Sequence, residues 1–166
     1  MGTELHWVDG PWPGKLAVSS RPRGGDWVED EVASWRRAGI DTVLSLLTPE
    51  EEQTLDLSRE AGAVKTRGMD FISLPIPDRQ VPGSETEVAS ALERVNTRLT
   101  AGKNVVVHCR QGVGRSGLIY ILARTRCWST ARRGLRNASG ALIDKVPGQI
   151  RVSVNLKLGL SLCSER

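Results

Sequence analysis

Residues 105–122 read VVVHCRQGVGRSGLIYIL, and this stretch decides the fold. Its three opening valines predict a buried strand, and its five closing residues are apolar enough to continue as a helix packed on a core. The intervening residues, 108–117, therefore predict a loop that leads from a strand into a helix N-terminus. Unpaired backbone N–H groups and the helix dipole favour an anion at such a place.

The loop carries a thiol and a guanidinium at a defined spacing. Cys109 is expected at the end of the strand, and Arg115 follows six positions later. Gly112 and Gly114 are expected to take positive φ and so to turn backbone N–H groups inward, forming a concave anion nest. A thiol that faces such dipoles and a guanidinium should ionise well below its free pKa of about 8.5. These groups suit attack of a thiolate on phosphorus.

The pattern His-Cys-x5-Arg-Ser at 108–116 resembles the signature of the protein tyrosine phosphatase superfamily, most closely its small dual-specificity branch. The similarity extends from about Leu16 to about Leu122. It implies an α/β fold, a three-layer domain whose central, mostly parallel sheet is flanked by helices. It also implies a phosphomonoester hydrolase that acts on phosphotyrosine in proteins, with phosphoserine and phosphothreonine as further substrates, through a cysteinyl-phosphate intermediate. A phosphoinositide or RNA 5′-phosphate phosphatase and a non-catalytic phosphate-binding module remain alternatives.

The resemblance assigns roles to the loop residues. Cys109 is the expected nucleophile, and Arg115 is expected to hold two phosphoryl oxygens in a bidentate grip. Ser116 is expected to donate a hydrogen bond to the departing Cys109 sulfur, and His108 to orient the loop from the buried side. The substrate-binding N–H groups are expected from Arg110, Gln111, Gly112, Val113, Gly114 and Arg115.

The resemblance also implies an aspartic acid on a separate loop, some thirty residues before the cysteine. Asp78 stands 31 residues before Cys109, within the stiff stretch Pro-Ile-Pro-Asp-Arg-Gln-Val-Pro. Asp70 is the competitor, but it is expected at the start of a strand, at the end of the sheet away from the loop. The chain lacks the Trp-Pro-Asp form of the larger tyrosine-specific branch, which favours the dual-specificity or an atypical branch.

Alternating strand and helix patterns independently favour an α/β fold. Strands are predicted over 16–19, 42–47, 71–76 and 103–108, and helices over 27–38, 49–62 and 84–101. The expected helix N-caps are Asp26, Thr48 (with Pro49 at the first helical position) and Ser84. Residues 1–15 predict an irregular N-terminal arm, and residues 16–166 a single domain in which the resemblance weakens beyond about residue 122.

The chain changes character after residue 122. Residues 124–134 show no clean helical face, and the alternation of Ile150, Val152 and Val154 suits short extended segments; a frame shift in the coding sequence is one hypothesis for this change. Residues 1–108 hold 12 Lys and Arg against 17 Asp and Glu, whereas residues 109–166 hold 11 against two. The basic part either surrounds the loop with a field that attracts phosphorylated substrates or forms a solvated tail.

Composition narrows the remaining classes. The chain has 166 residues, enough for a core, and its three cysteines and two histidines show no disulfide or metal-ligand spacing, so neither a metal nor another cofactor is expected. No segment approaches the ~18 apolar residues of a membrane span, and a reducing cytoplasm suits a catalytic thiolate. The expected partner is a phosphorylated protein or peptide, or another oxyanion in the loop. Arginines without interleaved aromatic residues do not predict nucleic-acid binding.

Overall fold

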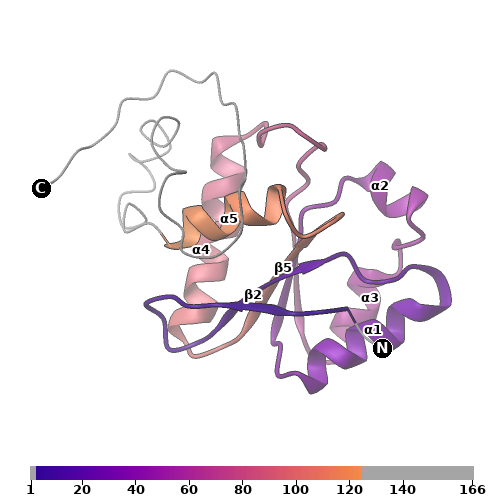
Figure 1. Ribbon diagram of the computed structural model, residues 1–166, viewed down its shortest axis with the longest axis horizontal. Coiled ribbons are helices and arrows are strands. Elements are labelled where there is room, and N and C mark those ends of the chain that lie inside the picture. The colour runs from indigo at the N-terminus through magenta and orange to yellow at the C-terminus, as the bar shows by residue number, and fades with distance from the viewer. Residues whose placement is uncertain (1–2, 125–166) are drawn as a thin grey trace, which may run out of the picture. The chain divides into compact units, whose positions relative to one another are not determined.

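The computed structural model describes residues 3–124, which contain a five-stranded sheet with helices on both of its faces (Figure 1). Along the sheet the strands are β1 (His6–Val8), β2 (Leu16–Ser20), β5 (Val105–Cys109), β3 (Thr42–Ser45) and β4 (Asp70–Ser73). All neighbouring pairs are parallel except β1 and β2, which are antiparallel. The predicted mostly parallel α/β sheet is confirmed.

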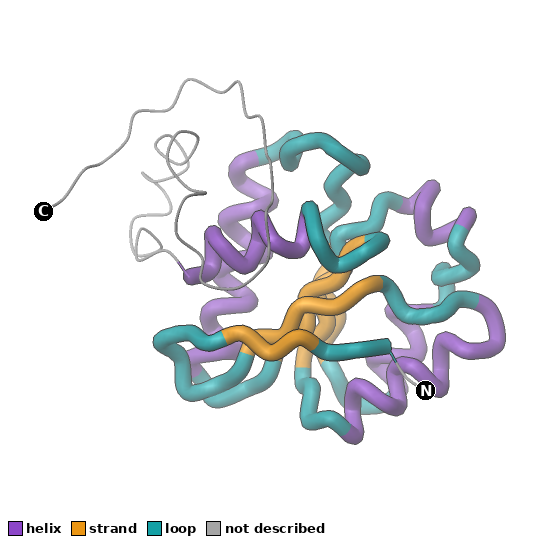
Figure 2. The backbone as a smooth tube through the Cα atoms, in the orientation of Figure 1, coloured by secondary structure: helices purple, strands orange, loops and turns teal. Residues whose placement is uncertain are grey.

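The helices form the two outer layers (Figure 2). One face is covered by α1 (Val28–Arg37) and α3 (Glu60–Thr66), which pack against each other. The other face carries α4 (Glu85–Thr100) and α5 (Arg115–Arg124), both of which contact β5. The short α2 (Pro49–Thr54) follows β3. The three-layer arrangement is the one expected when strands alternate with helices.

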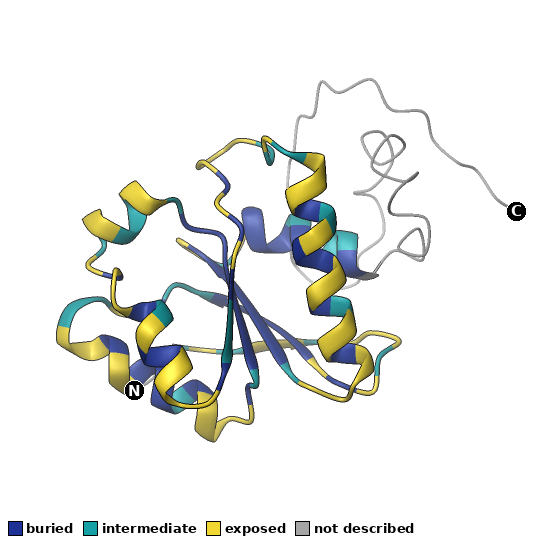
Figure 3. Ribbon diagram, turned by 180° about the vertical axis from the view of Figure 1, so that it is seen from behind, coloured by how far each residue is buried: buried dark blue, intermediate teal, exposed yellow. Residues whose placement is uncertain are grey.

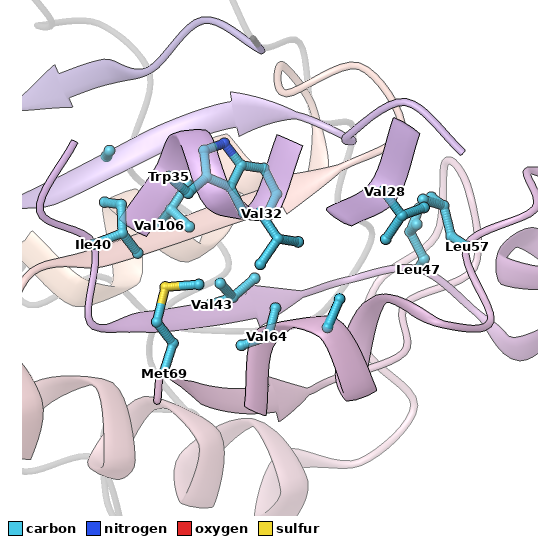
Figure 4. Close-up of a cluster of buried hydrophobic side chains, with 12 residues drawn as sticks. Val28, Val32, Trp35, Ile40, Val43, Leu47, Leu57, Val64, Met69 and Val106 are labelled. Atoms are coloured by element: carbon cyan, nitrogen blue, oxygen red, sulfur yellow. The ribbon is translucent and has the colours of Figure 1, made fainter. Parts of the chain in front are cut away.

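The central strand β5 is buried on both faces, as Figure 3 shows for the middle of the sheet. Val106 packs in a cluster with Val32 and Trp35 on the α1 side (Figure 4). Because successive side chains of a strand point to opposite faces, the residues at the end of β5 divide between the layers. His108 lies on the α1 side, where its ring centroid is 5.6 Å from that of Trp35, and Cys109 faces the layer of α5.

The single helix predicted over 49–62 is wrong, because the chain forms α2 and α3 with a break between them. Asp56 has φ of 54°, a left-handed conformation that ends α2. The break is also where another turn docks: Gly25 N donates to Asp56 O at 2.8 Å, and an added Cβ on Gly24 would lie 2.0 Å from Leu55 O. Tertiary packing of two backbone turns therefore interrupts a segment with helical sequence.

Two of the three predicted helix caps are present. Thr48 accepts a hydrogen bond from Glu51 N and the Glu51 carboxylate accepts one from Thr48 N, which completes a capping box. Ser84 accepts from Glu87 N at the start of α4. The cap expected at Asp26 is wrong, because a 3-10 turn (Gly25–Trp27) precedes α1 and includes Asp26.

The strand predicted over 71–76 stops earlier, at the end of β4. Prolines in the following segment lack the N–H that a regular ladder needs. The segment still runs along the extension of β3, where Leu74 N donates to Ser45 O at 2.9 Å and Ile76 N donates to Leu46 O at 3.2 Å. This places the loop after β4 beside the carboxyl end of β3.

The N-terminal segment, expected to be irregular over residues 1–15, instead contains β1. It pairs with the outer edge of β2 through main-chain groups, which needs no periodic side-chain pattern. Ser19 Oγ also donates to Glu4 O at 2.9 Å and ties the segment preceding β1 to the end of β2.

The described residues form one compact unit that ends at Arg124. The expectations for residues 125–166, including the extended segments and the basic tail, lie outside the described residues. The prediction of a single domain over 16–166 therefore remains a prediction.

Candidate active site

The loop between β5 and α5 has the predicted strand-to-helix position. Gly112 takes φ of 72°, and an ideal Cβ on it would lie 2.6 Å from the carbonyl carbon and oxygen of Ser19. Glycine is therefore required at 112 by conformation and by close backbone approach. The expectation for Gly114 is wrong: its φ is not positive, and an added Cβ would meet no atom within 4 Å. One left-handed residue is enough to turn this loop.

Backbone N–H groups of the loop converge on the Cys109 sulfur. Gly112 N donates to Sγ at 3.3 Å, and the thiol is only 3% exposed. Burial raises the pKa of Cys109, but the Ser116 hydroxyl and the N–H groups of Ser116, Gln111 and Gly112 outweigh burial and lower this pKa below its usual value. The sulfur is thus held in an environment that favours its anion.

Arg115 is held over the end of the sheet by a dense set of acceptors. Its Nη1 donates to Glu51 Oε2 at 2.6 Å and its Nη2 to Glu51 Oε1 at 2.8 Å, a bidentate pair. Nη1 also donates to the carbonyls of Ile76, at 2.6 Å, and Leu46, at 3.3 Å. The side chain is 5% exposed. These bonds use both N–H groups of Nη1 and one of the two on Nη2. The Nε–H and the second N–H of Nη2 therefore remain to bind a phosphoryl group.

Glu51 is a site residue that the sequence reasoning missed. Its place in the capping box is readable from the sequence, but its partner Arg115 is 64 residues away and is brought to it only by the fold. Hydrogen bonds from the Arg115 guanidinium are the main reason that the pKa of Glu51 lies below its usual value, although partial burial opposes the shift. A side chain that caps α2 thereby also orients the arginine of the loop.

Asp78 lies close to the loop, on the segment that follows β4. Its Oδ1 is 3.6 Å from Arg115 Nη2, and its side chain is 59% exposed. Gln80 N donates to Pro77 O at 3.1 Å, which closes a turn around Asp78. The competitor Asp70 starts β4, at the other end of the strand, and pairs there with Arg98 at 2.8 Å. The fold therefore brings Asp78, and not Asp70, to the arginine.

His108 has a partner that the sequence did not indicate. Its Nε2 lies 2.8 Å from Glu60 Oε1, and the two side chains are 0% and 1% exposed. Glu60 belongs to α3, on the face of the sheet opposite to α5. The contact brings two buried polar side chains together, but neither ring nitrogen and neither carboxyl oxygen has a hydrogen-bond partner within the described residues. The expected role of His108 in orienting the loop from the buried side remains a prediction.

The remaining loop residues form its rim. Arg110, Gln111 and Val113 are exposed, Val113 to 53%, whereas Ser116 is fully buried. No group of three His, Cys, Asp or Glu among residues 3–124 could hold a metal ion. No helix in the same part of the chain is long and apolar enough to cross a membrane.

Solved structures share this fold. The kinase associated phosphatase KAP, with its catalytic cysteine replaced by serine, matches at 18% identity and a TM-score of 0.67, over 82% of this chain and 83% of that one. Tk-PTP in its active form matches at 27% identity and a TM-score of 0.57, over 78% and 74%. PTPMT1 matches at 16% identity and a TM-score of 0.57, over 72% and 70%. No curated protein matches the sequence.

A family model also matches residues 17–128, which include β3, β4, β5, nearly all of β2, the loop after β5 and α5, but not β1. The model is described as "polymorphic toxin system, DSP-PTPase phosphatase". The match spans more than half of the chain and contains each of the residues Glu51, Asp78, Cys109 and Arg115. The chain therefore belongs to this family of cysteine-dependent, dual-specificity-like phosphatases.

Proposed function

We propose that this phosphatase removes phosphate from phosphotyrosine in proteins, and from phosphoserine or phosphothreonine at a lower rate. The observation that carries the proposal is the Cys109 sulfur, buried to 3% exposure and kept ionisable by converging N–H groups and the Ser116 hydroxyl. A long aryl phosphate reaches a buried sulfur more easily than the short side chain of phosphoserine does. The depth of the nucleophile therefore supports a preference for phosphotyrosine.

In the first step the Cys109 thiolate attacks phosphorus, the P–S bond forms, and the P–O bond to the tyrosine oxygen breaks. Arg115 binds two equatorial oxygens through its remaining N–H groups and stabilises the charge that develops on them. Asp78 donates a proton to the departing phenol oxygen. The loop N–H groups hold the third oxygen.

In the second step water attacks the cysteinyl phosphate and the P–S bond breaks, releasing inorganic phosphate. Asp78, now a carboxylate, accepts the proton of the water. Ser116 donates a hydrogen bond to the sulfur as it leaves, which stabilises the returning thiolate. Because this chemistry requires a reduced thiol, the proposal places the activity in a reducing compartment such as the cytoplasm.

The first experiment measures hydrolysis of p-nitrophenyl phosphate from pH 5 to 8 in the presence of EDTA, with vanadate as inhibitor. We expect activity in the wild type and none in Cys109→Ser. Cys127→Ser, which removes another thiol of the chain, is the matched control and should retain activity. Full activity in Cys109→Ser, or activity that requires an added metal ion, would refute the cysteinyl-phosphate mechanism.

The second experiment compares three peptides of one sequence that carry phosphotyrosine, phosphoserine or phosphothreonine at the same position. We expect kcat/KM to be highest for the phosphotyrosine peptide. Hydrolysis of p-nitrophenyl phosphate without turnover of any phosphopeptide would keep the phosphatase chemistry and reject protein substrates. Phosphoinositides and 5′-phosphorylated RNA would then be the substrates to assay.

A further inference from the structure

A cavity opens beside the catalytic loop, with a volume of about 320 Å³. We call it the arginine cavity, because three of its lining residues are Arg21, Arg23 and Arg110. Ser20 forms part of its wall, and Thr3 and Glu4 of the segment preceding β1 border it. The mechanism described above uses none of the side chains that line it.

The arginine cavity lies next to the nucleophile. Ser20 is the register partner of Cys109 in the adjacent parallel strand, and neighbouring strands are about 4.8 Å apart. An ideal Cβ on Gly112 would lie 2.7 Å from Ser20 N, so the wall of the cavity touches the catalytic loop. Arg110 directly follows Cys109 and lines the cavity. A group bound there would therefore be a near neighbour of the phosphate on which Cys109 acts.

The charges in the cavity are not balanced by its acids. Glu31 is buried, and although burial raises its pKa, hydrogen bonds from Thr3 and Arg23 lower it overall, so the carboxylate is ionised and already paired. The other acid, Glu4, is 82% exposed at its side chain. Among residues 3–124, neither Arg21 nor Arg110 has a carboxylate within 4.0 Å. Arg21 donates from Nη1 to the carbonyl of Pro22 at 3.1 Å, and the charge of Arg110 also acts on the Glu51 carboxylate. Neither guanidinium forms an ion pair within the described residues, so both keep N–H groups for an outside anion.

Packing holds the site in place without a ligand. The Glu31 carboxylate accepts hydrogen bonds from Thr3 N, at 2.6 Å, from the Thr3 hydroxyl, and from Arg23 Nε, at 2.6 Å. The Arg23 guanidinium also lies over the Trp27 ring, 4.4 Å from its centroid. These contacts tie the N-terminal segment to the turn after β2, so that one wall of the cavity is preformed.

We propose that the arginine cavity is a second anion subsite, which binds an acidic or phosphorylated side chain of the same peptide that presents its phosphotyrosine to Cys109. This inference rests on the proposed function. Alternate residues of an extended peptide lie on the same face, roughly 6.6 Å apart, so the side chain two positions from the phosphotyrosine is the nearest one that faces the same surface of the enzyme. The favoured substrate therefore carries an anionic side chain two residues from its phosphotyrosine.

Depth distinguishes a peptide from a compact phosphorylated polyol. Cys109 is 3% exposed, whereas Arg110 is exposed and Arg21 is half-buried. A second anion would thus bind nearer to the surface than the scissile phosphate. Phosphotyrosine extends far from its backbone, whereas neighbouring acidic side chains are shorter, so a peptide offers its two charges at unequal depths. Adjacent phosphates on a ring would lie at nearly equal depth.

The test compares two phosphotyrosine peptides that differ only at the positions two residues before and after the tyrosine, with glutamate in one and glutamine in the other. In the wild type we expect KM to be about fivefold lower for the glutamate peptide, as for a partly exposed ion pair, and this difference should shrink as salt is raised. Arg21→Gln should abolish the difference and leave p-nitrophenyl phosphate hydrolysis unchanged. Arg67→Gln, which removes an exposed arginine just before β4 at the other end of the sheet, should keep it.

Each other result overturns the inference. Equal KM values for the two peptides in the wild type would reject the subsite but not the proposed phosphotyrosine phosphatase activity. A preference for the glutamate peptide that persists in Arg21→Gln would have the same consequence. If p-nitrophenyl phosphate is hydrolysed but neither peptide is, the proposed function fails together with the peptide occupant. A parallel assay compares an inositol bisphosphate with an inositol monophosphate. If a preference that depends on Arg21 is found for the bisphosphate and not for the glutamate peptide, the cavity binds phosphorylated polyols and the peptide inference is rejected.

Discussion

Replacement of Gly112 by alanine is a direct test of how the loop holds its sulfur. The new Cβ would lie 2.6 Å from the Ser19 carbonyl carbon and oxygen, about 0.8 Å short of the 3.4 Å at which ordinary contacts begin. The contacted atoms belong to the backbone of β2, which pairs along its whole length with β5 and cannot give way as a flexible side chain would. Alanine at φ of 72° costs about 1–2 kcal/mol in addition. The loop itself must therefore move.

A movement of this size should remove most of the activity. Gly112 N is one of the groups that donates to the Cys109 sulfur, at 3.3 Å, and a misplacement near 1 Å costs on the order of 10²-fold in rate. We expect kcat/KM of Gly112→Ala for p-nitrophenyl phosphate to fall by on the order of 10²-fold. The pKa of Cys109, measured from the pH dependence of iodoacetate alkylation, should rise toward that of a free thiol because an N–H donor is lost.

Gly114→Ala is the matched control. It adds the same methyl group two residues along the same loop, where no atom lies within 4 Å and φ is not positive. Its kcat/KM and thiol pKa should stay within about twofold of the wild type, since the native backbone accepts alanine without strain. Equal losses in the two variants, or a fully active Gly112→Ala with an unchanged thiol pKa, would refute the reasoning from close backbone approach.

Three further predictions concern acidic residues around the loop. Asp78→Asn should lower kcat for a phosphotyrosine peptide by about 10²-fold or more and flatten the alkaline limb of its pH profile, whereas Asp70→Asn should not; equal effects would remove Asp78 as the acid. Because Arg115 lowers the pKa of Glu51, this carboxylate stabilises the fold above its unfolded pKa, near 4.5, and the stabilisation is lost as pH falls through the lower folded value. Glu51→Gln should thus make the urea midpoint depend less on pH in the acid range. It should also lower kcat/KM about tenfold or more, because Arg115 loses the partner that positions it. An unchanged pH dependence of the midpoint would contradict the pairing of Glu51 with Arg115. Glu60→Gln should destabilise the fold by about 1 kcal/mol or more in urea, because it changes one member of a buried pair of polar side chains. The exposed Glu29→Gln is the control, and equal midpoints would show that the pair contributes nothing.

Local rules were sufficient for much of the framework. The valines of β5, the glycine-containing loop and the apolar start of α5 predicted the strand, the turn and the helix in order. The caps at Thr48 and Ser84 were also readable, because a cap depends on residues three positions apart. The helix over 49–62 failed because the break at Asp56 results from docking against the turn at Gly25, which is distant in sequence.

The sequence by itself determined the family of the loop, the identity of the thiol and guanidinium, and the position of an aspartate on a neighbouring loop. Only the tertiary structure decided the partners of these groups: Glu51 for Arg115, Glu60 for His108, and the arginine cavity beside Cys109. The reason is physical. Loop conformation and capping depend on residues close in sequence, whereas a buried pair such as Arg115 and Glu51 forms only when packing brings α2 against the start of α5.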